Sequence, residues 1–172
     1  MPPDSAETFR LYLMRHAHAG WATPNTSDFE RPLDERGRFE ARDVAAQALM
    51  AGIRPDVLIS SPALRCRETT AAFLDVFRDL RSQEDEQLYS GGSDAYLGHI
   101  VAHRDVGSLM IIGHNPMIEA LAHHLARPSA IIAPIAMGYP TAGLLALSFP
   151  KPLPHKMLHA GEALRLIVPS LT

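Results

Sequence analysis

The chain has 172 residues, of which 47% are hydrophobic and 20% charged, and this fits one globular domain with its own core. A formal charge of −3 excludes a broad basic surface for nucleic acid or anionic lipid, and no apolar run approaches the roughly 20 residues that span a membrane. The single cysteine, Cys66, excludes an internal disulfide and favours a reducing compartment, so with no secretory signal we expect a cytoplasmic protein.

The first third of the chain contains a tail, a strand, a long loop and a helix. Residues 1–8 are polar and proline-rich, and we expect a flexible tail there before a single domain over 9–172. The stretch FRLYLM, 9–14, predicts an apolar strand. Residues 17–36 are rich in Pro, Asn, Ser and Asp and predict a loop, and the alanine-rich run 37–51 predicts a helix.

The rest of the chain alternates between strand and helix patterns. Ser61 and Pro62 resemble a helix N-cap and first helical residue, and Ser93 is a second candidate cap. The predicted strands are 56–60, 87–89, 108–113, 143–149 and 163–168, and the predicted helices are 62–80, 94–104 and 116–126. This alternation, with unbroken apolar runs at 56–60 and 108–112, predicts an α/β fold: one three-layer domain with a mostly parallel central sheet and helices on both faces.

Polar side chains follow three of the predicted strands directly. Arg15 and His16 come after the first strand, Arg65 comes shortly after the second, and His114 follows the strand at 108–113. Ligands of open α/β sheets bind outside the carboxyl ends of the strands, so we expect these four residues to converge.

A site of two arginines and two histidines has a specific chemistry. The guanidinium of arginine offers a planar fork of donors that matches phosphate or carboxylate oxygens. Histidine can act as a nucleophile, base or acid near neutral pH. Each residue alone could have an ordinary structural role, but the set together predicts phosphoryl transfer at an anion pocket.

These motifs resemble the histidine phosphatase superfamily, also called phosphoglycerate-mutase-like. The segments that carry the resemblance are LMRHA, SSPALRCRET and GHNP, and ERPLDERGR and YPTAGLLAL look like the compact SixA-type branch. The resemblance implies that His16 is the nucleophile and forms a phosphohistidine intermediate, that Arg15 and Arg65 hold the phosphoryl oxygens, and that His114 stabilises their charge. It also implies a weaker contact from Arg31, and neither metal nor cofactor.

The SixA-type branch is associated with removing phosphate from phosphohistidine on signalling proteins. Many superfamily members carry a general acid after the second arginine motif, where this chain has Ser90 after LY. The nearby acids, Glu84, Asp85, Glu86 and Asp94, are expected in solvated or capping positions. Imidazole needs little protonation to leave, so the missing acid favours phosphohistidine over an alkyl phosphate as substrate.

Other functions remain open on the sequence alone. A general phosphomonoesterase acting on a small phosphorylated metabolite and a non-catalytic phospho-ligand-binding protein both fit the motifs, whereas a mutase fits a short chain poorly. His16 with His18, or His99 with His103, could suggest metal ligands, but the chain is too short for an amidohydrolase barrel and His99 and His103 have no acidic partner in an HExxH pattern. We expect His18 to be an ordinary loop histidine.

Overall fold

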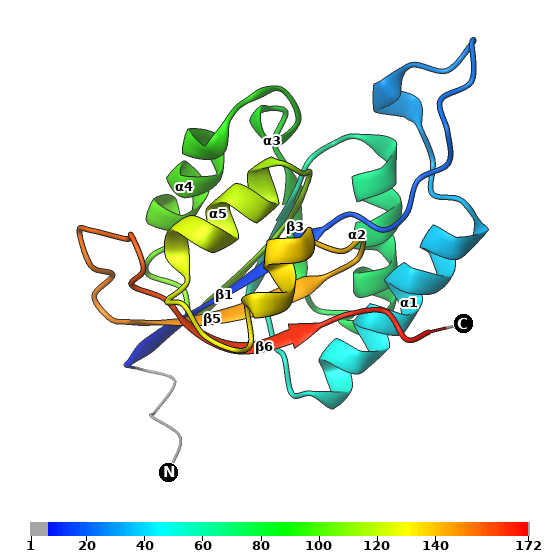
Figure 1. The fold of residues 1–172 in the computed structure, drawn as a ribbon. Coiled ribbons are helices and arrows are strands. Elements are labelled where there is room, and N and C mark those ends of the chain that lie inside the picture. The colour runs from blue at the N-terminus through cyan, green and yellow to red at the C-terminus, as the bar shows by residue number, and fades with distance from the viewer. Residues whose placement is uncertain (1–6, 172) are drawn as a thin grey trace.

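A six-stranded sheet runs through the centre of the computed structural model, which describes residues 7–171 (Figure 1). In sheet order the strands are β3 (Arg81–Glu84), β2 (Val57–Ser60), β4 (Ser108–Gly113), β1 (Thr8–Arg15), β5 (Leu144–Pro150) and β6 (Glu162–Ile167). The first four strands are mutually parallel, and β5 and β6 add an antiparallel extension. The expected mostly parallel sheet is therefore confirmed.

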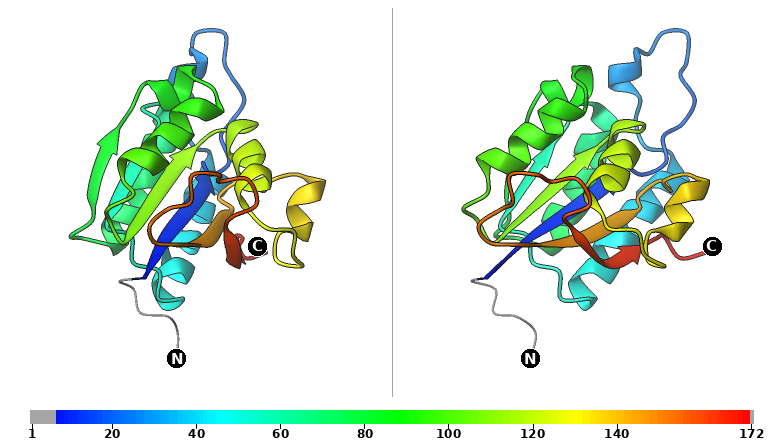
Figure 2. Two further views of the ribbon diagram at one scale, coloured as in Figure 1. Left: turned by 90° about the vertical axis from the view of Figure 1, so that its left-hand side faces the viewer. Right: turned by 60° about the vertical axis from the view of Figure 1, so that its left-hand side comes forward.

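Helices cover both faces of this sheet (Figures 1 and 2). One face carries α1 (Glu35–Met50) and α2 (Leu64–Val76), and the other carries α4 (Ser93–Ala102) and α5 (Met117–Leu125). The short helical turns are η1 (Asp28–Glu30), α3 (Gln87–Ser90) and η2 (Ala133–Met137). None of the helices within 7–171 combines the length and apolar character needed to cross a bilayer.

The alternation of side chains along β1 explains why two cores form. Leu11 and Leu13 pack in the cluster that contains α4 and α5, whereas Tyr12 and Met14 pack in the cluster that contains α1 and α2. Arg15, the last residue of β1, lies two positions after Leu13 and therefore on the same face of the strand as Leu11 and Leu13. The strand therefore directs Arg15 toward the face of α5, and His16, the next residue, lies toward α2.

Some predicted elements are shifted or wrong. The predicted strand at 87–89 is helix α3, and the strand of this region is β3, whose residues are all exposed. Its sequence, RSQE, has no apolar alternation that could have revealed a strand. The tail predicted over 1–8 lies outside the described residues up to position 6, and Thr8 already belongs to β1.

Two predicted helix caps are also wrong. Helix α2 begins at Leu64 after Ala63, which gives no side-chain cap, and α4 begins after Gly92. The hydroxyl of Ser61 instead contacts His114, and the hydroxyl of Ser93 contacts Met117 Sδ at 3.6 Å. Both serines have tertiary partners that sequence-local capping rules do not include.

Candidate active site

Three distant segments bring His16, Arg65 and His114 together at the carboxyl edge of the parallel strands. His16 follows β1, His114 follows β4, and Arg65 lies in the first turn of α2. β1 and β4 are neighbours, so the His16 backbone N–H donates to the Gly113 carbonyl at 3.0 Å. The hydrogen-bonded ladder itself thus sets the spacing of the two histidines.

The guanidinium of Arg65 lies between the two imidazoles, and the Arg65 side chain is only 8% exposed. Its Nε donates to Nε2 of His16 at 3.3 Å, and its Nη2 lies 3.3 Å from Nδ1 of His114. The two imidazole rings are edge-to-face with centroids 5.3 Å apart. Three of the four residues expected to converge are therefore in direct contact.

His16 is held as a neutral imidazole with one defined tautomer. Its Nδ1 lies 2.7 Å from the Ala17 carbonyl, which can only accept, so Nδ1 carries the proton. Burial lowers the pKa of His16, the bond to Ala17 raises it, and the charges of His114, Arg65 and Arg15 lower it, so that the pKa is about 3. The unprotonated Nε2 therefore faces Arg65.

His114 is neutral too, and its ring is fixed from behind. Arg65 can only donate, so Nδ1 of His114 accepts from its Nη2, and Nε2 carries the proton and donates to the hydroxyl of Ser61 at 2.7 Å. Burial, followed by the charge of Arg65, lowers the pKa of His114 to about 4. Cys66 Sγ lies 3.5 Å from Nε2, and burial raises the pKa of this thiol to about 12, so Cys66 contributes packing and no thiolate.

Arg15 adjoins this group but has no hydrogen bond to it. Its Nη1 donates to the Tyr139 carbonyl at 2.7 Å, as expected from its place on the α5 face. Within the described chain, its Nε is buried and has no partner. Its guanidinium therefore still has donors available for an anion, the buried Nε among them.

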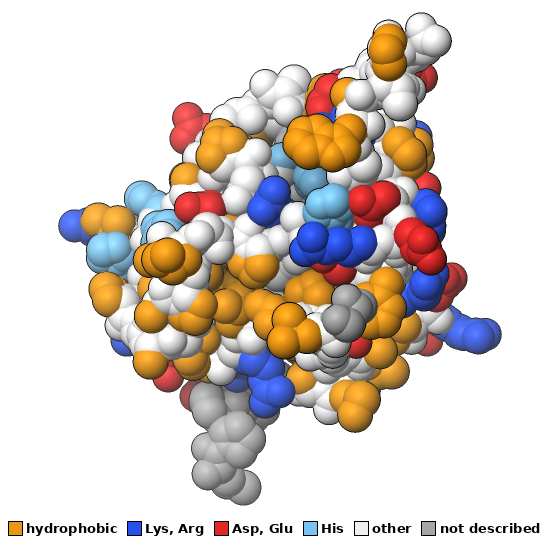
Figure 3. Space-filling view, turned by 45° about the vertical axis from the view of Figure 1, so that its right-hand side comes forward, with side chains coloured by type: hydrophobic (Ala, Val, Ile, Leu, Met, Phe, Trp, Pro, Cys, Tyr) orange, Lys and Arg blue, Asp and Glu red, His pale blue; other side chains and the backbone are white. Residues whose placement is uncertain are grey.

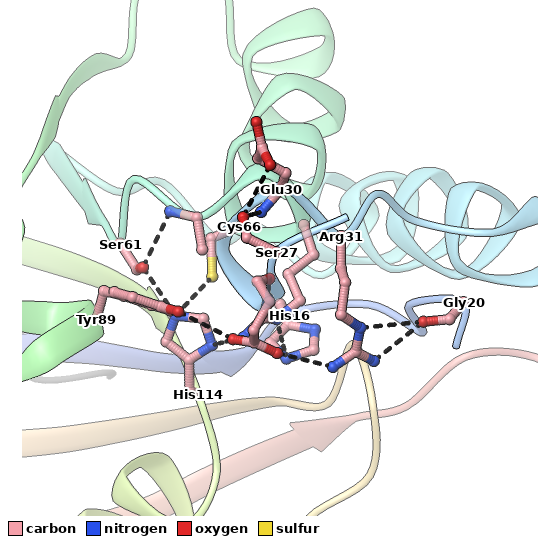
Figure 4. Close-up of polar contacts among 12 residues, drawn as sticks. His16, Gly20, Ser27, Glu30, Arg31, Ser61, Cys66, Tyr89 and His114 are labelled. Atoms are coloured by element: carbon pink, nitrogen blue, oxygen red, sulfur yellow. Dashed lines mark hydrogen bonds and ion pairs between the residues drawn. The ribbon is translucent and has the colours of Figure 1, made fainter. Parts of the chain in front are cut away.

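Arg31 is committed to the loop between β1 and α1. Its Nε and Nη2 donate to the Gly20 carbonyl at 3.1 and 3.0 Å, and its Nη1 donates to Asp28 at 2.9 Å. Figure 4 shows Arg31 between His16 and Gly20. The structure thus places Arg31 at the edge of the site with its donors engaged by protein atoms.

Asp28 and Tyr89 belong to the site and were missed by sequence reasoning. Asp28 Oδ2 accepts from Arg65 Nη2 and from the Tyr89 hydroxyl, both at 3.0 Å (Figure 4). The Tyr89 ring packs edge-to-face on His114 with centroids 5.7 Å apart. The i, i+3 spacing in DFER could have predicted the pair with Arg31, but no local signal indicates a contact with α2.

The acidic residues after the second arginine motif have no hydrogen bond or ion pair with His16 or His114 among the described residues. Glu84 binds Arg67 through bonds of 2.9 and 2.7 Å, and Asp85 lies 2.7 Å from His99. Glu86 and Asp94 are exposed. The only hydrogen bond of the Ser90 hydroxyl within 7–171 is to the Glu86 carbonyl.

The other candidate histidines have ordinary partners. Nδ1 of His18 lies 2.6 Å from Asp34, and His103 Nδ1 lies 2.8 Å from the His99 carbonyl. Across the described residues, no three or more His, Cys, Asp or Glu side chains are grouped as metal ligands would be. On the face that Figure 3 shows, histidine and cationic side chains gather near the centre, next to acidic ones.

Comparisons with known proteins give this arrangement a family. The family description "Histidine phosphatase superfamily (branch 1)" matches residues 11–90. A crystal structure of a candidate phosphohistidine phosphatase SixA from Agrobacterium tumefaciens is 35% identical, with a TM-score of 0.83 over 93% of this chain and 97% of that one.

Two relatives of undescribed function align over most of the chain. An uncharacterized protein of Mycobacterium tuberculosis is 32% identical over 78% of this chain and 85% of its own length. An uncharacterized chloroplastic protein of Arabidopsis thaliana is 30% identical over 74% of this chain, and the aligned part spans 63% of that protein. Together with the three motifs that carry His16, Arg65 and His114, these matches show that the chain belongs to the histidine phosphatase superfamily, in its SixA-type branch.

Proposed function

We propose that this protein is a phosphatase that transfers a phosphoryl group from its substrate to His16 and then to water. The observation that carries the proposal is the state of His16: a neutral imidazole whose unprotonated Nε2 faces a buried arginine. A nucleophile needs an unprotonated lone pair, which here accepts a hydrogen bond from Arg65 until a phosphoryl group takes that donor, and a phosphoryl group needs donors around it. The site offers both.

The arginines would hold the phosphoryl oxygens. The Nε and Nη2 atoms of Arg65 form one edge of its guanidinium and face the two histidines. Arg15 is next to His16 in the chain, and its Nε has no hydrogen-bond partner within 7–171. In the first step, Nε2 of His16 bonds to phosphorus as the bond from phosphorus to the leaving group breaks. In the second step, water attacks phosphorus, the bond to Nε2 breaks, and inorganic phosphate leaves.

His114 would change its protonation state when a phosphoryl group binds. In the free protein its pKa is lowered to about 4, but a dianion next to Nδ1 favours the protonated ring. Nδ1 would then donate to a phosphoryl oxygen while Nε2 still donates to Ser61. Ser61 thus keeps the ring oriented in both states.

Phosphohistidine on a signalling protein is the substrate that fits this site best. The acids at 84–94 are paired or exposed, and hydrogen bonds from Arg31 and Arg65 lower the pKa of Asp28 to about 2 although its partial burial raises it. Asp28, which contacts Arg65 at this site, is therefore ionised near neutral pH and cannot act as a general acid. An alkoxide would leave slowly without one, whereas imidazole takes up its proton from water readily.

The intermediate is tested by trapping. We expect labelled substrate mixed with enzyme and quenched in alkaline denaturant to leave phosphate on the protein that is stable to base and released by acid. The label should be absent from His16→Ala. A label that survives this substitution, or an ester-like label that base removes, would refute His16 as the nucleophile.

The substrate is tested by comparing turnover on two phosphate donors. A small protein phosphorylated on histidine should be hydrolysed with a kcat/KM at least about 100-fold above that of an alkyl phosphate monoester, from the usual contribution of general acid catalysis. Equal or faster turnover of the alkyl ester would favour a general small-molecule phosphomonoesterase. Phosphate binding without any turnover of either donor would favour a non-catalytic phospho-ligand-binding protein.

A further inference from the structure

We propose that Asp28 is a positioning residue, which holds one edge of the Arg65 guanidinium so that the other edge faces the phosphoryl site. The inference rests on the proposed function, because it takes Arg65 as a phosphoryl-binding residue. Asp28 lies in η1, 37 positions before Arg65, and the two side chains meet only through the fold of the loop between β1 and α1.

The two edges of Arg65 have different partners. The edge formed by Nε and Nη2 faces His16 and His114, at 3.3 Å from each ring. The edge formed by Nη1 and Nη2 faces Asp28: Nη1 donates to its main-chain carbonyl at 2.6 Å and Nη2 to its carboxylate at 3.0 Å. Asp28 therefore need not move away for a phosphoryl group to bind at the first edge.

Asp28 is itself fixed by two further donors. Arg31 donates to Oδ1 at 2.9 Å and is anchored on the Gly20 carbonyl, while the Tyr89 hydroxyl donates to Oδ2 at 3.0 Å. The turn that carries Asp28 is capped by Ser27, whose hydroxyl accepts from the Glu30 backbone N–H. A carboxylate held from several directions can hold a guanidinium in one orientation.

The charge balance is compatible with binding an anion. A carboxylate beside a phosphoryl site would repel the dianion if it were uncompensated. Here Arg31 and Arg65 both contact Asp28, so this group of three retains a net positive charge, to which Arg15 adds. Arg31 thus contributes to the site through Asp28, in addition to any contact it makes with substrate.

Aromatic packing links the same turn to the second histidine. Phe29, next to Asp28, packs edge-to-face on Tyr89 with centroids 5.0 Å apart, and Tyr89 packs in the same manner on His114. The turn therefore contacts Arg65 through Asp28 and His114 through Tyr89. The position of this turn therefore helps to determine how Arg65 and His114 lie relative to each other.

The test compares Asp28→Asn with Glu30→Gln, which removes a carboxylate charge from the same turn. Among the described residues, the Glu30 carboxylate has a hydrogen bond only from the Ser27 hydroxyl. Inorganic phosphate is the probe of binding, measured by calorimetry, and kcat and KM are measured with a phosphohistidine protein. We expect Asp28→Asn to weaken phosphate binding and to lower kcat/KM by about 10- to 100-fold, as misplacement of a binding group by up to 1 Å does. Glu30→Gln should change neither value by more than about twofold.

A second comparison separates positioning from a general structural effect. In an Arg65→Ala background, Asp28→Asn should have no further effect on phosphate affinity, because the residue through which it acts is absent. Equal losses in both backgrounds, or a tighter binding of phosphate by Asp28→Asn, would overturn the inference; the second result would show that Asp28 competes with the anion. Phosphate affinity needs no chemistry, so it tests Asp28 even if trapping on His16 fails.

Discussion

Gly113→Ala should disturb both the core and the active site, because Gly113 leaves no room for a side chain. A Cβ atom there would lie 2.6 and 2.9 Å from Cε1 and Cζ of Tyr96, and closer still to its hydroxyl. Tyr96 is fully buried, and its hydroxyl donates to the Leu88 carbonyl at 2.8 Å and accepts from the His114 backbone N–H at 3.3 Å. The ring cannot move without losing these bonds.

The size of the effect follows from these contacts. Ordinary carbon contacts are about 3.5–4.0 Å, so the Tyr96 ring must shift by roughly 1 Å. Overpacking of this kind costs about 1–3 kcal/mol, and weakening two buried hydrogen bonds adds about 1–2 kcal/mol. A displacement of His114 by up to 1 Å would lower kcat/KM by about 100-fold. We therefore expect a loss of about 2–5 kcal/mol of stability together with a large loss of activity.

The assay combines urea denaturation with steady-state kinetics, and Gly98→Ala is the matched control. Gly98 lies in the same helix as Tyr96, is exposed, and has nothing within 4 Å of an added Cβ. Alanine there should stabilise the protein by about 0.5–1 kcal/mol and leave activity unchanged. If Gly113→Ala behaved like Gly98→Ala, the packing argument for the end of β4 would be wrong.

Three further predictions concern charged and polar groups. Arg65→Lys should lower kcat/KM by about 30- to 1,000-fold, because a lysine cannot reproduce a two-bonded edge worth about 2–4 kcal/mol. The pKa values of His16 and His114, about 3 and 4, lie below the usual 6.5, so in weak acid the unfolded chain binds more protons than the folded chain. As the pH is lowered from 6 to 5, these two groups should therefore reduce the free energy of unfolding by about 2 kcal/mol. Glu40→Ala should cost about 2–4 kcal/mol, measured by urea denaturation, since the buried Glu40 carboxylate accepts from Thr141 and from the His18 backbone.

Each of these predictions has its own control. Arg67→Lys should leave kcat/KM unchanged, because Arg67 is exposed and its only hydrogen-bond partner in the described part of the chain is Glu84. A double variant with glutamine at His16 and His114 should lose the pH dependence assigned to them, and an unchanged slope would show that other groups cause it. For Glu40, unfolding at the same urea concentration as the parent chain would contradict the assigned role.

The sequence predicted the elements whose signal is local. The apolar runs at 56–60 and 108–112 predicted strands β2 and β4, and the residues that follow them, with Arg15 and His16, indicated the composition of the site. A strand end and the residues just beyond it are adjacent in the chain. Their position therefore follows from the strand assignment and the rule for parallel sheets.

Features that depend on contacts between distant segments were not predicted. Three such contacts form only in the folded chain: Arg15 binds the Tyr139 carbonyl away from His16, Ser61 binds His114, and Asp28 binds Arg65. The exposed strand β3 is defined only by its pairing with β2, because its own residues have no apolar pattern. Local propensity does not contain such information.

The bond between the His16 amide and the Gly113 carbonyl has a consequence for variation among related chains. Because two adjacent central strands carry the histidines, connections that leave the sheet could lengthen, shorten or change composition while the separation of the imidazoles stayed constant. Recognition of different phosphorylated molecules could thus diversify in the surrounding loops around an invariant chemical centre. Exchanging the 17–34 connection between relatives, with Asp28 and Arg31 retained, should alter which donor is accepted while the covalent intermediate still forms on the same nitrogen.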